Sequence, residues 1–291
     1  MGTDKRARQK EQHKSRAEEA RKSQATAARR KRLVNIGLAS LLAVGLVGAL
    51  SLFGSNDDSE TADPSSTTAA GGSTTTPGDT GPDASAVPAE LKGPGAGKEI
   101  TGKTPCPKAD GSSPRTTKFA EAPPMCIDVD KNYAATVTTN KGEFVIALDA
   151  KAAPETVNNF VVLARYGFYN GIPFHRIVPN FVIQGGDPSD SPTGGGGPGY
   201  TIGEEPPADK TYEQYDLAMA KTSEPNSTGS QFFVVTGDPA ALNSAGTYSL
   251  FGTVLSGREV VDAIGATPTA GASGDSPTEQ ITMDKVVITE K

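Results

Sequence analysis

One stretch of the chain, residues 174–187, carries side chains that could do chemistry on an uncharged substrate. Arg176, Phe181 and Gln184 follow one another at intervals of five and three residues, on strand-like sequence that ends in a pair of glycines. An arginine is permanently charged and donates from several N–H groups, and a glutamine amide both donates and accepts hydrogen bonds. Such a set can hydrogen-bond a substrate held against an aromatic ring, but it contains no nucleophile.

A second stretch, residues 219–235, has the same character. It begins with Met219 and Ala220 and later brings Gln231 next to a pair of aromatic residues that ends at Phe233. The two stretches together offer one arginine and two glutamines among aromatic and aliphatic side chains.

Other kinds of chemistry lack the residues they require. The two histidines are His13 and His175, and both cysteines precede the strand-rich region, so neither a Cys/His nucleophile nor a metal site has its ligands. On a strand, His175 would face the side opposite Arg176, and we expect it to pack inside the fold. The glycine run 194–197 lacks the Lys-Ser/Thr of a phosphate loop. We expect no metal and no organic cofactor.

The two stretches resemble the signatures of the cyclophilins, the barrel-shaped peptidyl-prolyl cis-trans isomerases. Two long ungapped blocks in the expected order are far more specific than a three-residue pattern. The resemblance covers about residues 134–290 and implies a mainly β fold, a closed eight-stranded antiparallel barrel capped by two helices. It also implies that the partners are proline-containing polypeptides.

Rotation of a prolyl amide suits these residues, because it needs neither a nucleophile nor a metal. The barrier of about 18–20 kcal/mol comes from amide resonance, which is lost as the C–N bond twists. The twisted nitrogen gains a lone pair that can accept a hydrogen bond, and Arg176 is the donor that the resemblance implies. A bond that strengthens in the transition state accelerates the reaction, by tenfold for each 1.36 kcal/mol.

The remaining roles follow from the resemblance. Gln184 would orient Arg176 and touch the substrate carbonyl, while Ala220 and Gln231 would lie along the peptide groove and Tyr248 would close its side. The pocket for the proline ring would consist of Phe181, Met219, Phe233 and Leu242.

Two positions depart from the family pattern. Lys221 replaces the common Asn after Met-Ala, and Ala241 takes the place of a tryptophan that helps many relatives to hold the cyclic peptide cyclosporin. We therefore expect weak cyclosporin binding. Two other readings stay open at this point: a non-catalytic module or chaperone that binds proline-containing segments, and a structural cell-envelope protein that uses the barrel as a spacer.

Alternation and turn residues predict the elements that must position these side chains. Residues 134–139 and 142–148 alternate apolar and polar around Asn140-Lys141, which is typical of a hairpin. Pro154 begins a helix that continues over 155–165, and a second helix fits 257–264. The other predicted strands are 174–178, 182–185, 216–220, 231–236, 250–255 and 281–288.

The N-terminal part has a different composition. Residues 1–32 hold 12 Lys/Arg and 4 Asp/Glu, whereas the rest of the chain holds 16 and 30. Residues 33–53 carry no charge and are long enough to cross a bilayer as a helix. The basic residues before them predict, by the positive-inside rule, a single-pass signal-anchor in the cell membrane with a cytoplasmic N-terminus and an extracytoplasmic C-terminal bulk. A cleaved signal peptide is the alternative. The basic tail favours lipid headgroups over nucleic acid.

Residues 54–103 are rich in Ser, Thr, Gly and Pro and are predicted to form a disordered linker. Residues 104–133 form a lead-in that contains both cysteines, ahead of an isomerase domain over 134–291. In an oxidising space, Cys106 and Cys126 would form a disulfide. A bridge across about 20 residues would stabilise the fold by roughly 3 kcal/mol in the chain-entropy account.

Overall fold

The structure is a computed structural model that describes residues 86–189, 192–209 and 211–291. The predicted basic tail, the predicted membrane helix over 33–53 and most of the predicted linker lie outside these ranges. Within them, no helix is both long enough and apolar enough to cross a bilayer.

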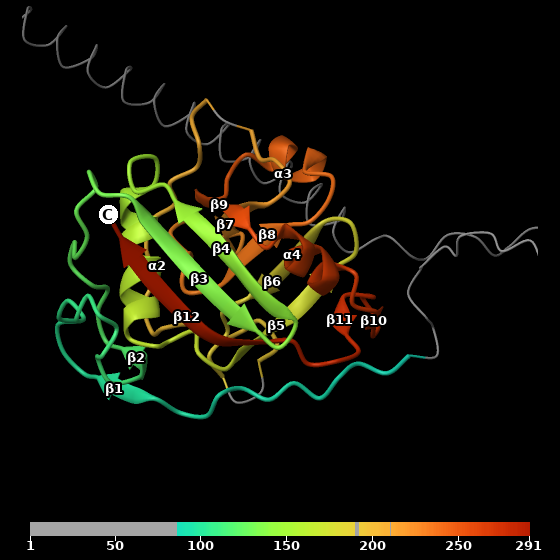
Figure 1. The fold of residues 1–291 in the computed structure, drawn as a ribbon, viewed down its shortest axis with the longest axis horizontal. Helices are drawn as coiled ribbons and strands as arrows, with labels where there is room; N and C mark the ends of the chain where they lie inside the picture. The colour runs from blue at the N-terminus through green and yellow to red at the C-terminus, as the bar shows by residue number, and fades with distance from the viewer. Residues whose placement is uncertain (1–85, 190–191, 210) are drawn as a thin grey trace, which may run out of the picture. The chain divides into compact units, whose positions relative to one another are not determined.

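Eight strands close into an antiparallel barrel, as the resemblance implies (Figure 1). Their order around the barrel is β12-β3-β4-β9-β7-β8-β6-β5, and β12 pairs with β5 to close it. All eight strands coincide with segments predicted from the sequence, within two residues at either end. The strands are β3 (Tyr133–Thr139), β4 (Gly142–Leu148), β5 (Ile172–Val178), β6 (Val182–Gly185), β7 (Asp216–Met219), β8 (Phe232–Val235), β9 (Leu250–Ser256) and β12 (Thr282–Glu290).

The hairpin of β3 and β4 shows why the alternating pattern was informative. Tyr133, Ala135 and Val137 are buried, whereas the residues between them are only partly covered. The two strands are joined by the predicted turn, and Gly142 follows it with φ +128°, a conformation that glycine adopts without strain. One face of the hairpin thus lines the barrel interior and the other meets solvent.

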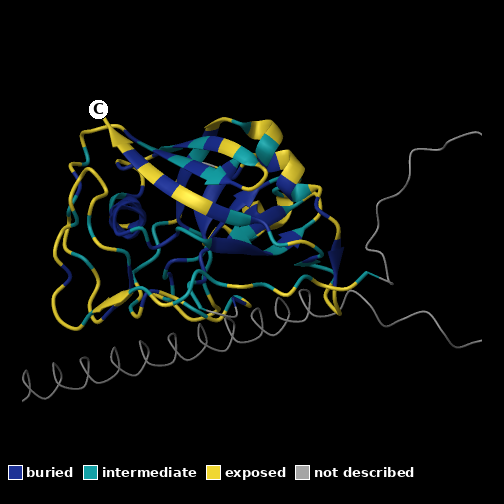
Figure 2. Ribbon diagram, turned by 60° about the horizontal axis from the view of Figure 1, so that its bottom comes forward, coloured by how far each residue is buried: buried dark blue, intermediate teal, exposed yellow. Residues whose placement is uncertain are grey.

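Helix α2 (Pro154–Arg165) is buried along almost its whole length, as Figure 2 shows in dark blue. Pro154 stands in its first turn, as predicted, and the backbone N–H groups of Glu155 and Thr156 donate to the carboxylate of Glu205 at 3.1 and 2.8 Å. A negative charge at a helix N-terminus satisfies free N–H groups and opposes the helix dipole. The carboxylate that caps the helix belongs to a residue 50 positions away in the sequence, so no local sequence motif predicts this cap.

Helix α4 (Arg258–Gly265) confirms the second predicted helix. A third, α3 (Ala240–Ala245), was not predicted, because six residues with one buried side chain, Leu242, show no helical period. Two short strand pairs were also missed for lack of length. These are β1 (Lys98–Ile100) with β2 (Thr116–Phe119), and β10 (Thr269–Ala270) with β11 (Ser276–Pro277).

The lead-in is held to α2. Cys106 and Cys126 form a disulfide, which confirms the predicted pair, with their Cα atoms 5.4 Å apart. The side-chain amide of Asn158 on α2 accepts from the backbone N–H of Cys126 and donates to the carbonyl of Pro124. The lead-in also contributes Phe119 to the barrel core. The lead-in is therefore part of the folded unit.

Residues 86–103, which composition placed in the linker, run along the barrel. Strand β1 pairs in parallel with β2, and the Ala89 N–H donates to the carbonyl of Pro277 at 2.8 Å. Composition measures how much apolar surface a segment can bury, and it does not register backbone pairing with a distant strand.

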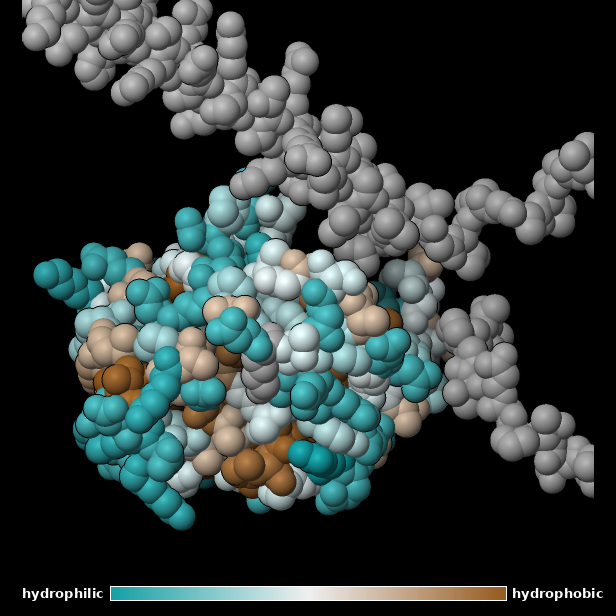
Figure 3. Space-filling view, turned by 90° about the horizontal axis from the view of Figure 1, so that it is seen from above, coloured by the Kyte–Doolittle hydropathy of each residue, from teal (hydrophilic) through white to brown (hydrophobic). Residues whose placement is uncertain are grey.

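The surface of the described part is mostly hydrophilic on the face in Figure 3, with small separate hydrophobic patches.

Candidate active site

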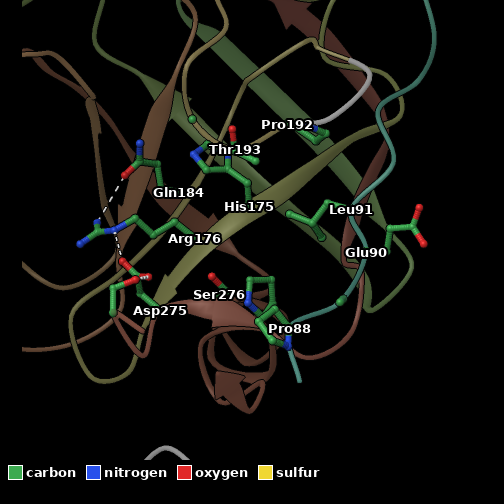
Figure 4. A pocket seen from close by; sticks show the side chains of 14 residues that line it. Pro88, Glu90, Leu91, His175, Arg176, Gln184, Pro192, Thr193, Asp275 and Ser276 are labelled. Carbon is green, nitrogen blue, oxygen red and sulfur yellow. Dashed lines mark hydrogen bonds and ion pairs between the residues drawn. The ribbon is translucent and has the colours of Figure 1, made fainter. Parts of the chain in front are cut away.

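Arg176 lies on β5 and is held on two sides. Its Nε donates to Oδ2 of Asp275 at 2.8 Å, and its Nη1 donates to Oε1 of Gln184 at 3.4 Å (Figure 4). Its side chain is 36% exposed, so the guanidinium stands at the surface with its aliphatic part against the barrel. Among the described residues, its Nη2 has no partner. The group is oriented and keeps one nitrogen free to donate.

Gln184 and Gln231 continue the chain of hydrogen bonds. Gln184 lies opposite Arg176 in the β5–β6 register and donates from Nε2 to Oε1 of Gln231 at 3.1 Å. Gln231 in turn donates to the carbonyls of Gly194 and Gly196 at 2.7 and 2.8 Å. Each amide accepts on one side and donates on the other, so the whole line has one direction.

The glycine loop that ends this line is anchored by Asp187. The N–H groups of Gly194 and Gly196 both donate to Oδ2 of this fully buried carboxylate at 2.9 Å, and Ser189 donates to Oδ1. Burial raises the pKa of Asp187, but the hydrogen bonds outweigh it, and the pKa lies below its ordinary value. Asp187 therefore stays ionised and holds the loop over the groove.

An apolar cluster lies beside this line. It contains Phe181, Phe233, Leu242, Tyr248 and Ala220, which β6, β8, α3 and the neighbouring loops bring together from distant parts of the sequence. The rings of Phe233 and Tyr248 meet edge to face, with centroids 5.4 Å apart. Because Gln184 pairs with Phe233 in the β6–β8 register, the polar line and the apolar cluster share one edge.

A cavity of about 300 Å³ extends the groove from Gln184 and Gln231 toward Ala220 and Lys221. Lys221, which replaces the family's common Asn, points its ammonium toward Glu204 at 3.9 Å. The departure therefore places an ion pair at this end of the groove.

The comparisons agree with this geometry. Residues 134–288 match the family model described as cyclophilin type peptidyl-prolyl cis-trans isomerase/CLD. The chain belongs to this family. It is thus a cyclophilin-type peptidyl-prolyl cis-trans isomerase, an enzyme, over the part that forms the barrel.

Relatives with this description cover the same half of the chain. A probable peptidyl-prolyl cis-trans isomerase A from Mycobacterium leprae is 40% identical over 176 residues, which are 54% of this chain and 93% of that protein. A peptidyl-prolyl cis-trans isomerase B from Streptomyces anulatus is 40% identical over 172 residues, 53% of this chain and 95% of that protein. The crystal structure of a Cryptosporidium parvum cyclophilin-type isomerase aligns with a TM-score of 0.50 and 30% identity, covering 55% of this chain and 99% of its own.

Met219 lies apart from the other predicted pocket residues of the cyclophilin domain. It is fully buried and belongs to the main barrel core, whereas Phe181, Phe233 and Leu242 share the separate cluster. The side chain that joins them is Val182, which is 2% exposed and follows Phe181 directly. The strand pattern could have identified Val182, because it lies two residues before Gln184 on the same strand.

His175 does not face away from Arg176, as strict alternation had led us to expect. The β5–β6 register shifts between Phe174 and Arg176, so His175 occupies a β-bulge and lines the same cavity as Arg176 and Gln184. Burial lowers the pKa of this imidazole to about 4, and neither ring nitrogen has a hydrogen-bond partner in the described part of the chain. The ring is therefore neutral at physiological pH.

Two further residues of the site had not been anticipated. Asp275, the partner of Arg176, lies 99 residues away in sequence, and its backbone carbonyl accepts from the N–H of Ile177. Tyr212 donates its hydroxyl to the Tyr248 carbonyl at 2.6 Å and binds Asn243 of α3 through its backbone. Tyr212 thereby fixes both Tyr248 and the helix that carries Leu242. Neither residue belongs to a recognisable local motif.

Proposed function

We propose that this isomerase accelerates rotation about X-Pro bonds in exported or cell-envelope proteins, with Arg176 stabilising the twisted amide. The observation that carries the proposal is the double restraint on Arg176. Asp275 holds Nε and Gln184 holds Nη1, so Nη2 remains available at the edge of the apolar cluster. A donor oriented in advance does not have to reorganise when the amide nitrogen becomes a hydrogen-bond acceptor.

The apolar cluster supplies the place for the proline ring. Phe181, Phe233 and Leu242 would contact the ring, and Met219 would support the pocket from within the barrel core. Burial of the ring in this cluster would hold the X-Pro bond beside Arg176 in both isomers. Rotation is then favoured by the hydrogen bond that forms only in the twisted state.

The glutamines would guide the rest of the peptide. Gln184 presents its amide between Arg176 and Gln231, within reach of a substrate carbonyl. Ala220 and Gln231 line the cavity that continues the groove, and Tyr248, which packs against the apolar cluster, would close the side of the groove. None of these steps requires a cofactor.

The test is protease-coupled isomerisation of a short X-Pro peptide by the full chain and by Arg176→Ala. Loss of the guanidinium is expected to lower kcat/KM by roughly a hundredfold, since one preorganised donor contributes about that much. Arg258→Ala is the matched control, because Arg258 lies over the ring of Tyr215 and, within the described part of the chain, lines neither cavity next to Gln184. Equal turnover by wild type and Arg176→Ala would contradict the role of Arg176. Near-background rates for well-folded wild type would favour a proline-binding module or chaperone.

We also propose that residues 33–53 anchor the enzyme in the cell membrane, with residues 1–32 in the cytoplasm and the isomerase domain outside. The charge asymmetry around the uncharged segment supports this topology, and the Cys106–Cys126 disulfide supports an oxidising location for the barrel. Protease treatment of intact spheroplasts should digest an epitope tag at the C-terminus and spare one at the N-terminus. The opposite protection pattern would overturn the proposal, and a tag released into the medium would indicate cleavage.

A further inference from the structure

A second cavity adjoins the one next to Ala220, and Gln184 and Gly194 line both of them. Its volume is about 640 Å³, and Arg176, Gln184 and His175 form its inner wall. The loop at Thr193 and the turn at Ser276 flank it. Gln184 lines both cavities, so an extended chain that crosses the site can reach into each of them.

The outer wall of this cavity comes from the segment that precedes the barrel. Pro88, Ala89, Glu90 and Leu91 all line it, and Figure 4 shows Leu91 directed inward while Glu90 turns away. These residues belong to the stretch whose composition is that of a linker. The cavity therefore exists in this form only because residues 88–91 lie against the barrel.

Several contacts fix the wall. The Ala89 N–H donates to the Pro277 carbonyl at 2.8 Å. The side chain of Gln280 accepts from the Lys92 N–H at 2.8 Å and donates to the Lys92 carbonyl at 3.0 Å. Further on, Pro94 packs so closely on Gly171 that a side chain at that position would collide with it. The wall is thus tied to the barrel by one hydrogen bond from Ala89 and by two at Lys92, the residue that follows the wall.

His175 supports the inner wall of the cavity from within. His175 is 7% exposed, and neither Nδ1 nor Nε2 has a hydrogen-bond partner within the described residues. Both nitrogens are closed off from solvent, and the Gly194 position lies directly over Nε2. The ring therefore shapes the inner wall by packing, and the hydrogen-bonding groups open to a ligand come from the other lining residues.

The charges of the cavity exclude a strongly charged ligand. Arg176 and Asp275 neutralise one another at 2.8 Å, and the Glu90 carboxylate points away. The rest of the lining mixes apolar surface from Leu91 and the prolines with the amide of Gln184 and with hydroxyls of threonine and serine. An uncharged segment of polypeptide, with both apolar side chains and backbone hydrogen-bonding groups, fits this lining.

We propose that this cavity is a second subsite of the isomerase groove, which binds uncharged residues of the substrate on one flank of the X-Pro bond. Residues 88–91 build its wall, so the segment that precedes the barrel contributes to substrate preference. The inference rests on the proposed function in one respect, namely that a polypeptide crosses the groove at Arg176.

The experiment compares three peptides with one X-Pro core: a tetrapeptide, and versions extended by three uncharged residues on the N-terminal or the C-terminal side. For each protein, the ratio of kcat/KM for an extended peptide to that for the tetrapeptide is measured with the full chain. In Leu91→Ala the ratio for one of the two extended peptides should fall about fivefold, through lost apolar contact. Val87→Ala is the matched control, because Val87 lies on the same segment, is 77% exposed and does not line the cavity.

A second variant, Gln280→Ala, releases the wall without changing a cavity side chain, and it should lower the same ratio. Ratios equal to that of wild type in Leu91→Ala and Gln280→Ala, for both extended peptides, would overturn the subsite. Failure of the proposed mechanism gives a different result, since Arg176→Ala would then turn over the tetrapeptide as fast as wild type. The ratio remains measurable in that case.

Discussion

The guanidinium of Arg176 is bound through Nε to the carboxylate of Asp275, at 2.8 Å, across 99 residues of sequence. The turn that carries Asp275 is itself fixed, because its backbone carbonyl accepts from Ile177, the residue after Arg176. Ser273 donates a further hydrogen bond to the same carboxylate. Burial raises the pKa of Asp275, but these hydrogen bonds and the charge of Arg176 lower it overall, so the carboxylate stays ionised.

Asp275 should act as a positioning residue for Arg176. Asp275→Ala is expected to lower kcat about tenfold with little change in KM. Without the carboxylate, the guanidinium of Arg176 is no longer held in one orientation, but the residues that bind the substrate are unchanged. Asp275→Asn keeps an acceptor for Nε and should recover most of the loss. Asp284→Ala, on the exposed side of β12, serves as the control. A tenfold loss shared equally by the Ala and Asn variants would show that charge, and not orientation, is what matters.

His175 should make stability depend on pH in a range that begins well above the usual pKa of carboxylates. Its pKa is about 4 in the folded protein, because burial disfavours the imidazolium, and about 6.5 when unfolded. The unfolded chain therefore binds a proton first as the pH falls, and stability decreases from about pH 6.5 down to about pH 4. Between pH 7.5 and 5 the expected loss is about 2 kcal/mol in the free energy of unfolding.

The charged groups that face His175 do not reverse the predicted loss of stability at low pH. Asp187 and Asp275 raise the pKa of His175 and Arg176 lowers it, but burial is the largest effect. Both carboxylates have lowered pKa values and remain charged at pH 5. Urea denaturation at the two pH values measures the loss, and His175→Phe should abolish most of it. An unchanged pH dependence in that variant would assign the effect elsewhere.

The strands and the two longer helices could be predicted because their information is local, whereas closure into a barrel was implied by the family resemblance. Alternation on β3 and β4 and a proline at the start of α2 depend only on neighbouring residues, and all were confirmed. The arrangement of the site residues could not be predicted from local sequence. Asp275 reaches Arg176 only through the paired β10 and β11, and the bulge at His175 depends on the register between β5 and β6, which alternation along one strand does not give.

The wall of the second cavity was missed for a related reason. Residues 86–103 look like linker because they contain few large apolar residues, yet their contacts are mostly backbone hydrogen bonds to Pro277, Gln280 and Arg115. Likewise, Met219 and Val182 are both apolar residues near the groove. Which of them joins the apolar cluster depends on which face of its strand meets α3, and that follows from the closed barrel rather than from spacing.

The glycine loop over the groove should tolerate substitution at one position and not at its neighbour. A Cβ on Gly196 would collide with the Asp187 carboxylate, whereas a Cβ on Gly195 would meet nothing within 4 Å. Gly196→Ala is expected to cost about 2 kcal/mol, by displacing the loop from its buried anchor. Gly195→Ala should be near neutral. Thermal unfolding of the two variants checks this, and equal melting temperatures would mean that the loop is not anchored through Asp187.

Cyclosporin binding should be weak and should respond to position 241. Ala241, which replaces the tryptophan of many relatives, is exposed and directly precedes Leu242 of the apolar cluster. A tryptophan there would extend the cluster and add an indole N–H donor at its edge. Titration calorimetry should therefore give at least about tenfold tighter binding for Ala241→Trp than for wild type, as an indole contact of about 1.4 kcal/mol would provide. Ala245→Trp, at the far end of α3, is the control for a nonspecific aromatic effect. Tight binding by the wild type would show that the remaining groove residues suffice to hold the cyclic peptide.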